Sequence, residues 1–239
     1  MEIKVLASGS KGNCYRVSDG STSLLLECGI SMKDIRVGLG FKLSEIDACL
    51  LSHEHQDHSK SVKHITKAGI DTYMSEGTRN AIKIGNHRIK VIKAHKQFRI
   101  GTFKIVPFGT KHDAAEPLGF LIYSTATGEK LLFATDTYYI EYHFHKLTHI
   151  MVECNYSSEI LKTAVDADLT PLALKNRLLS SHFSLENVLK FLKANDLSSV
   201  QAIILLHLSD NNSDEALFKM EVQKATGKQV YIANPGLEV

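Results

Sequence analysis

Short runs of apolar residues, most of them four or five residues long, recur along the whole chain. Such runs, bounded by polar or glycine-containing segments, are typical of β-strands. They predict ten strands, at residues 3–7, 24–28, 48–52, 89–93, 103–107, 119–123, 130–134, 150–153, 202–206 and 229–233. Longer segments with the spacing of one apolar helix face predict six helices, at residues 31–39, 59–68, 77–84, 171–180, 184–194 and 214–225.

The order of these elements indicates the fold class. Strands and helices are interspersed in both halves, without the strict alternation of a doubly wound parallel sheet. Mixed sheets that pack on each other and carry outer helices fit the order better. Ser184 and Ser213, each followed by acidic residues, are typical helix starts, and Gly69 and Gly227 follow predicted helix ends.

Composition narrows the class of protein. The 239 residues are 44% hydrophobic and 23% charged, with a net charge of +2, which predicts one globular domain over residues 1–239. No apolar run is long enough for a membrane span, and the first residues lack the pattern of a signal peptide. The four cysteines are scattered, so we expect reduced thiols in a cytoplasmic protein. The twelve histidines are the unusual feature.

Four side chains that can bind metal follow the apolar strand at 48–52. His53, His55, Asp57 and His58 lie within six positions. Imidazoles and a carboxylate suit zinc, manganese or iron. Four ligands so close together are too many for one ion, but they fit a pair of ions about 3.5–4 Å apart. The alternative, a solvated polar loop, fits this density of ligands poorly.

This motif resembles that of the metallo-β-lactamase fold superfamily, and the similarity extends over nearly the whole chain. The resemblance implies an α/β (α+β) fold, a four-layer αββα sandwich of two mixed sheets with outer helices. It also implies further ligands at later strand ends, where His112, Asp136 and His207 stand. It assigns one metal to His53, His55 and His112, the other to Asp57, His58 and His207, and makes Asp136 the bridge, leaving room for a bridging hydroxide.

Further motifs resemble those of one branch of this superfamily, the YycJ/WalJ-like proteins, which are related to ribonuclease Z. The matching segments are 6–13, 111–120, 153–156, 174–184 and 207–212. Members of the branch are regarded as 5′-to-3′ DNA exonucleases, which implies two divalent ions and a nucleic acid substrate, single-stranded DNA or RNA. The chain departs from the family at Ser181, where a glycine commonly precedes the histidine.

The same resemblance implies catalytic roles. Asp57 or Asp136 would orient the attacking hydroxide. His182 would be the general acid, and Glu153, which matches its carboxylate partner, would raise its pKa and favour the protonated form. The alternative is that His182 only caps a helix and that Glu153 lies at an exposed strand end.

Substrate-binding residues are expected near the last ligand and on the helix at 171–180. Ser209, Asn211 and Asn212 could bind a terminal phosphate. Lys175 and Arg177 could hold backbone phosphates or could simply be solvated. The glycine-containing loop at 8–13 could cradle a phosphate, shape the site, or be only a tight turn.

Other functions remain open at this point. The metals could instead hydrolyse a small cyclic phosphodiester, a thioester or a lactone, or the protein could be a metal-binding regulator without turnover. A homodimer is the commonest assembly, and no membrane partner is expected. The remaining histidines are interpreted as surface or structural residues: His64, His87, His95, His143, His145 and His149.

Overall fold

The computed structural model describes residues 1–239, which form two compact units. Unit 1 comprises Met1–Gly109, Ala114–Glu129 and Ala233–Val239. Unit 2 comprises Thr110–Asp113 and Lys130–Ile232.

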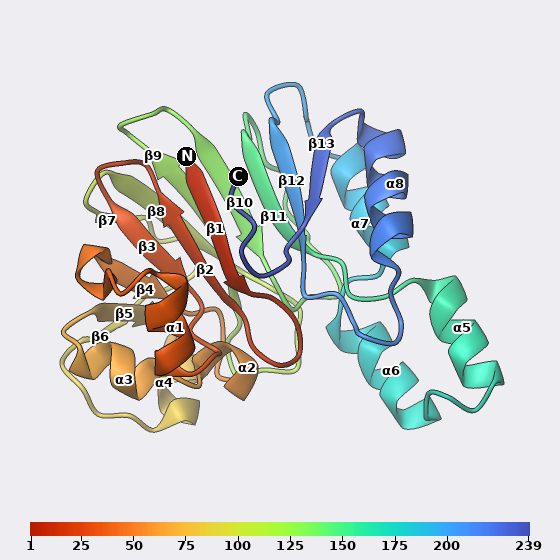
Figure 1. The fold of residues 1–239 in the computed structure, drawn as a ribbon, viewed down its shortest axis with the longest axis horizontal. Coiled ribbons are helices and arrows are strands. Elements are labelled where there is room, and N and C mark those ends of the chain that lie inside the picture. Colours follow the sequence, from red (N-terminus) through yellow and green to blue (C-terminus); the bar gives the residue numbers. More distant parts are fainter. The chain divides into compact units, whose positions relative to one another are not determined.

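Unit 1 contains a six-stranded mixed sheet with the strand order β1-β2-β3-β4-β5-β6 (Figure 1). The first three strands pair antiparallel, and the pairs from β3 to β6 are parallel. The strands are β1 (Glu2–Ala7), β2 (Cys14–Ser18), β3 (Ser23–Leu26), β4 (Ala48–Leu50), β5 (Asp71–Met74) and β6 (Ile89–Val91).

Short helices connect the strands of this sheet. They are α1 (Met32–Gly38), the 3-10 turn η1 (Leu43–Glu45), α2 (Gln56–Ser59), α3 (Val62–Lys67) and α4 (Glu76–Ile82). Ile35 of α1 and Val62 and Ile65 of α3 pack with Leu25 and Cys49 of the strands in one buried cluster. This burial of apolar faces holds the helices on the sheet. Unit 1 also contains three antiparallel strands, β7 (Phe98–Ile100), β8 (Phe103–Gly109) and β9 (Leu118–Ser124).

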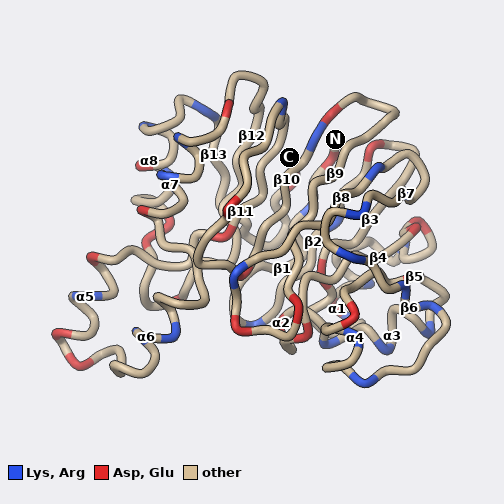
Figure 2. Tube along the Cα trace, turned by 180° about the vertical axis from the view of Figure 1, so that it is seen from behind, with Lys and Arg blue, Asp and Glu red and all other residues tan.

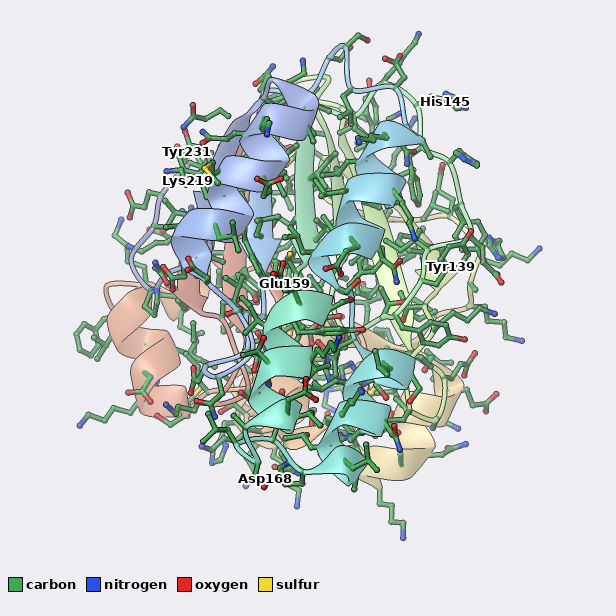
Figure 3. The ribbon with its side chains drawn as sticks, turned by 90° about the vertical axis from the view of Figure 1, so that its right-hand side faces the viewer. Tyr139, His145, Glu159, Asp168, Lys219 and Tyr231 are labelled. Atoms are coloured by element: carbon green, nitrogen blue, oxygen red, sulfur yellow. The ribbon has the colours of Figure 1, made fainter.

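Unit 2 is built on four parallel strands in the order β13-β12-β11-β10. They are β10 (Lys130–Ala134), β11 (His149–Glu153), β12 (Ala202–Leu206) and β13 (Gln229–Ile232). Every residue of β11 and β12 is buried, as expected for a parallel sheet. The helices are α5 (Ser158–Asp166), α6 (Leu172–Ser181), α7 (Leu185–Lys193) and α8 (Glu215–Thr226), and Figure 3 shows Glu159 at the start of α5 and Asp168 just beyond its end.

The observed elements confirm the predicted strands and helices and add several to them. Each predicted segment has a counterpart, and the predicted helix at 59–68 corresponds to α3. The elements β2, β5, β7, α2 and α5 were not expected. The expected helix start at Ser213 is wrong, since Asp214 is the N-cap and accepts a hydrogen bond from the Leu217 amide. Ser184 is the N-cap of α7, as expected. No helix has the length and apolar character needed to cross a membrane.

Candidate metal centre and acid–base pair

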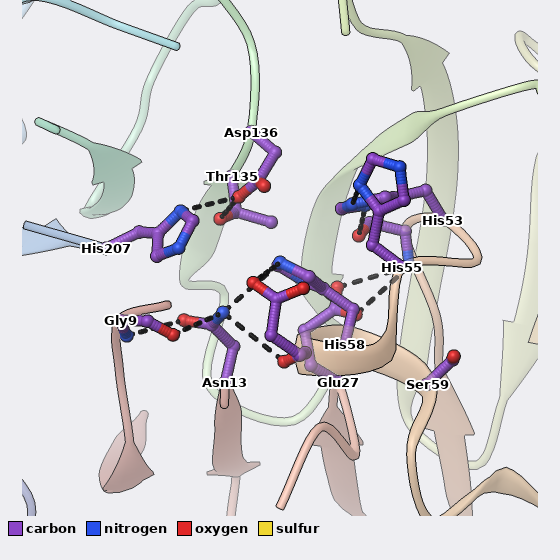
Figure 4. Close-up of polar contacts among 12 residues, drawn as sticks. Gly9, Asn13, Glu27, His53, His55, His58, Ser59, Thr135, Asp136 and His207 are labelled. Atoms are coloured by element: carbon purple, nitrogen blue, oxygen red, sulfur yellow. Dashed lines mark hydrogen bonds and ion pairs between the residues drawn. The ribbon is translucent and has the colours of Figure 1, made fainter. Parts of the chain in front are cut away.

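In unit 1, the loop after β4 and the short helix α2 that follows it bring three predicted histidine ligands together (Figure 4). His53 Nε2 lies 3.2 Å from His55 Nδ1, and the ring centroids of His53 and His58 are 4.2 Å apart. Asp57 Oδ2 lies 3.4 Å from His58 Nε2. His53 and His58 are buried, while His55 and Asp57 are partly exposed. The predicted motif therefore forms one cluster of nitrogen and oxygen atoms that could bind a metal ion.

Two of these imidazoles are oriented by neighbouring side chains. His53 Nδ1 lies 2.8 Å from Ser52 Oγ, and His58 Nδ1 lies 3.4 Å from a carboxylate oxygen of Glu27. Because the carboxylate can only accept a proton, it favours the tautomer of His58 that keeps its proton on Nδ1 and its lone pair on Nε2. This is the form in which a histidine binds metal.

Glu27 is a site residue that the sequence reasoning missed. Its buried carboxylate accepts hydrogen bonds from the Ser52 amide, at 3.1 and 3.4 Å, and its backbone is left-handed, with φ of 64°. Burial raises the pKa of Glu27, and His58 and Ser52 offset only part of that rise. An acidic residue directly after the apolar run Leu24–Leu25–Leu26 was the available signal.

The loop at 8–13 packs against the histidine motif through its own backbone. The Gly9 amide donates to Asn13 Oδ1, the Gly12 amide to the Gly9 carbonyl, and the Asn13 amide to the Asp57 carbonyl. Asn13 Nδ2 also lies 3.2 Å from His58 Nε2. These three amides already have acceptors, so they are not available to cradle a phosphate, and their contacts link the loop to the metal-binding segment.

Unit 2 brings together the other three predicted ligands, which lie at or just beyond strand ends. His207 Nδ1 lies 2.9 Å from Asp136 Oδ1, and His112 Nε2 lies 3.5 Å from Asp136 Oδ2. Thr135 Oγ1 donates to Asp136 Oδ1 at 2.7 Å (Figure 4). Asp136 and His207 both have positive φ, at 43° and 51°. Backbone strain of this kind is concentrated at functional sites.

His112 is held in the form that binds metal. Its Nδ1 lies 2.8 Å from the Ser181 carbonyl oxygen, so Nδ1 carries the proton and Nε2 keeps its lone pair. Burial lowers the pKa of His112, although the charge of Asp136 and the bond to Ser181 oppose that effect. The imidazole is therefore neutral at physiological pH. The hydrogen bond from His112 uses the backbone carbonyl of Ser181, so it does not depend on which side chain stands at position 181.

Glu153, at the end of β11, is surrounded by hydrogen-bond donors. Its Oε1 lies 2.6 Å from His182 Nδ1 and 3.2 Å from His207 Nδ1, and its Oε2 accepts from the amides of Thr137 and Phe183 at 2.9 and 3.1 Å. Both oxygens are thus occupied by protein donors. Glu153 is fully buried, so the alternative of an exposed strand end is wrong.

Electrostatics within this buried group favour a charged pair. Burial alone would lower the pKa of His182, but Glu153 raises it, and the net change is upward. Burial alone would raise the pKa of Glu153, but His182 and His207 lower it, and the net change is downward. His207 follows the same pattern, because Asp136 and Glu153 outweigh burial and raise its pKa to about 10. The donor atoms of Asp136, Glu153, His182 and His207 all lie within 4.8 Å of one another.

The predicted substrate-binding residues lie in different environments. Asn212 is buried, and its side chain bonds Ser209 Oγ at 3.2 Å and Thr170 Oγ1 at 3.4 Å, so it holds the loop. Asn211 is exposed, and Ser209 is partly buried. Lys175 is partly buried, and the exposed Arg177 donates to Asp113 Oδ2 at 3.2 Å. Of the six histidines interpreted as surface or structural, only His149 is buried, and Figure 3 shows His145 at the surface.

Comparison with known proteins identifies the family. A family model described as a beta-lactamase superfamily domain matches residues 23–208. The chain belongs to the β-lactamase superfamily. Among its relatives is the exodeoxyribonuclease WalJ of Streptococcus pneumoniae, 30% identical over 92% of this chain and 86% of that protein. Another is the exodeoxyribonuclease YycJ of Bacillus anthracis, 26% identical over 100% of this chain and 94% of that protein. The predicted relationship to the YycJ/WalJ-like branch is confirmed.

Solved structures confirm the predicted fold class. The metallo-β-lactamase fold protein YhfI from Bacillus subtilis matches with a TM-score of 0.77 at 16% identity, over 100% of this chain and 98% of that chain. The short form of human tRNase Z matches with a TM-score of 0.68 at 13% identity, over 100% and 98% of the two chains. The superfamily member described here is a metal-dependent hydrolase, and its clusters of histidine and aspartate are suited to divalent metal ions.

Proposed function

We propose that this hydrolase is a nuclease, a 5′-to-3′ exonuclease acting on DNA with two divalent ions. The observation that carries the proposal is the buried hydrogen bond of 2.6 Å between Glu153 and His182, beside Asp136 and His207. Cleavage of an ordinary phosphodiester expels an alkoxide, which needs a proton donor. A histidine whose protonated form is favoured by a buried carboxylate meets that need.

The ligand set follows the family resemblance. His53, His55 and His112 would hold one ion, Asp57, His58 and His207 the other, and Asp136 would bridge them. The residues fit this role, because Ser52, Glu27 and the Ser181 carbonyl each contact Nδ1 of a histidine, which directs its Nε2 toward the other predicted ligands of its own cluster. Zinc, manganese or iron suits such donors. When bound, two such ions lower the pKa of water and neutralise charge on the phosphoryl oxygens.

His182 would act as the general acid through Nε2. Its Nδ1 is held by Glu153, so the ring cannot turn without losing a buried charge-assisted hydrogen bond. Glu153 raises the pKa of His182, which favours the protonated form, the form in which Nε2 could donate to the leaving oxygen. Glu153, with both oxygens engaged by donors of the protein, would position His182 and stabilise its charge. Asp57 or Asp136 would orient the attacking water.

The relatives named exodeoxyribonucleases support DNA as the substrate. Ser209 and Asn211 would bind the terminal phosphate, and the buried Asn212 would support them by holding Ser209. Lys175 and Arg177 on α6 would contact the backbone phosphates. Replacing Asn211 and Asn212 by alanine should then weaken the preference for 5′-phosphorylated ends.

An end-labelled nuclease assay tests the proposal. The substrate is 5′-phosphorylated single-stranded DNA with Mn²⁺ or Zn²⁺, and the controls are EDTA and Asp57→Ala. We expect stepwise loss of nucleotides from the 5′ end, abolished by both controls. Absence of cutting by protein that binds two ions per chain would refute the nuclease and direct attention to a cyclic phosphodiester, a thioester or a lactone.

A further inference from the structure

Charge is distributed very unevenly along the chain. Residues 58–109, all in unit 1, contain eleven lysines and arginines but only two acidic residues, Asp71 and Glu76. The whole chain has a net charge of only +2, so the remaining residues are net acidic. A strongly basic region is therefore present although the net charge of the whole chain is small. This basic region, residues 58–109, includes α3, α4, β6 and the β7–β8 hairpin. Figure 2 shows blue segments gathered over α3, α4 and β6.

Most of these basic side chains have no acidic partner. The two acidic residues pair with Arg79, Arg88 and Lys90, at 3.1, 3.1 and 3.6 Å. The other eight have no ion pair with a carboxylate, and all eight are exposed: Lys60, Lys63, Lys67, Lys83, Lys93, Lys96, Arg99 and Lys104. The surface thus carries a substantial uncompensated positive charge.

Two like-charge pairs lie within this region. Arg99 and Lys104 are directly opposite each other on the antiparallel strands β7 and β8. Lys63 and Lys67 are four residues apart on α3, which places them on the same face of the helix. Both arrangements destabilise a folded protein when no anion is bound. A bound polyanion would turn this repulsion into attraction.

A hollow of about 440 Å³ lies in the same region, between α4 and β6. Arg79 and Lys83 line it together with the side chains or backbone of Asn80 and Asn86, and no acidic residue lines it. Lys83 ends α4 in a left-handed conformation, with φ of 56°. The hollow therefore offers both positive charge and hydrogen-bond donors at one place on the basic region.

We propose that this basic region of unit 1 binds the sugar–phosphate backbone of nucleic acid outside the hydrolytic site. The first basic residue of the region, Lys60, lies two residues after His58, so a nucleic acid strand that lies on the region would pass close to the end of the metal-binding motif. Unpaired lysines and arginines are the usual contacts to phosphates and carry little sequence information. The inference rests on the proposed nuclease function, because it assigns that enzyme a non-specific docking surface for its polymer substrate.

Binding in EDTA, where turnover is excluded, separates this inference from the nuclease proposal. The probe is fluorescein-labelled single-stranded DNA, longer than the roughly 4–16 nucleotides of a typical binding site, followed by anisotropy from about 50 to 200 mM salt. The test variant replaces both like-charge pairs: Lys63→Gln, Lys67→Gln, Arg99→Gln and Lys104→Gln. The matched control removes four lysines of α7 and α8 in unit 2: Lys190→Gln, Lys193→Gln, Lys219→Gln and Lys224→Gln (Lys219 is labelled in Figure 3).

We expect the test variant to bind about tenfold more weakly or worse, with the magnitude of its salt slope reduced by about 0.7 for each lost contact. The control should change less than about twofold. Hydrolysis of bis(p-nitrophenyl) phosphate should be unchanged in both, which shows that the hydrolytic site is intact. Equal weakening in the test variant and the control, or unchanged binding in the test variant, would overturn the inference. So would binding of the native protein to phosphatidylglycerol vesicles without binding to DNA.

Discussion

At the scale of single residues, the contact between Glu153 and His182 connects the fold to the chemistry. The carboxylate is fully buried at the end of β11 and receives two backbone amides besides the imidazole. These amides fix the carboxylate before any substrate arrives, so the position of His182 is set by the fold. A proton donor that is already oriented needs no rearrangement in the transition state.

Replacing Glu153 by glutamine should change the pH dependence of hydrolysis. If His182 is the general acid proposed above, it acts in its protonated form, so the rate should fall as the pH rises through its pKa. Glu153 raises that pKa, so Glu153→Gln should move the fall to lower pH and reduce the rate at neutral pH. A pH–rate profile measures the shift. Glu141→Gln, which removes an exposed partner of Lys111, is the control, and a profile that moves equally in both variants would contradict this role.

Glu27 should matter for metal affinity. Its carboxylate lies beside Nδ1 of His58, and loss of such an orienting partner typically weakens metal binding by about 10–100-fold. We expect Glu27→Gln to bind zinc more weakly than the native protein. In a competition titration, a chelating dye should therefore remove zinc from the variant at a lower dye concentration. Glu45→Gln, which removes an exposed partner of Lys42, should behave as the native protein. Equal zinc affinity in the two variants would show that Glu27 does not orient His58.

The seven metal ligands stay predictions, and the sequence could indicate them because four are close together in sequence and the family resemblance implies three more at strand ends. The motif from His53 to His58 lies in one short segment, and His112, Asp136 and His207 lie at or just after apolar strands. The residues that orient them could not be predicted in this way. Glu27 and Asn13 are distant in sequence from His58, and Ser181 acts through its backbone carbonyl.

At the scale of elements, the position of the histidine motif depends on a close backbone contact. A Cβ atom on Gly29 would lie only 1.6 Å from the Asp57 carbonyl oxygen. The segment after β3 and the start of α2 therefore meet where only glycine fits. Hydrogen bonds from the Asn13 amide to the Asp57 carbonyl and from the Cys28 amide to the His58 carbonyl complete this contact.

Gly29→Ala should accordingly displace the start of α2. Because the obstacle is backbone, the clash cannot be relieved by a side-chain movement, and we expect a loss of about 3 kcal/mol or more in the free energy of unfolding. Urea unfolding in EDTA measures this loss independently of metal. Gly85→Ala is the control, since a Cβ atom there would meet nothing within 4 Å. If Gly29→Ala loses no more free energy of unfolding than Gly85→Ala, the contact between Gly29 and Asp57 is not tight.

The elements that the sequence did not predict share a physical feature. β2 and β5 have no clear alternation of polar and apolar residues, and β7 has only three residues. Their strand conformation comes from pairing with neighbours, which no local pattern reveals. β10, β11 and β12 were predictable because they are buried on both faces and read as continuous apolar runs.

At the scale of the whole molecule, the two units divide the predicted chemistry. Unit 1 carries four of the predicted ligands and the basic region, whereas unit 2 carries the other three ligands and the Glu153–His182 pair. The family match extends over residues of both units. A single domain over residues 1–239 and a homodimer stay predictions. Exposed leucines on α6, at positions 172, 174 and 179, are suited to such an interface.

The most direct test of the proposed mechanism measures how fast His182→Ala hydrolyses two substrates with different leaving groups. A general acid matters for an alkoxide but little for p-nitrophenolate, which leaves without a proton. We therefore expect the variant to lose about 10²–10⁴-fold in cleavage of single-stranded DNA, with little loss on bis(p-nitrophenyl) phosphate and unchanged metal content. Equal losses on the two substrates, or native cleavage of DNA, would contradict the role of His182 and with it the proposed mechanism.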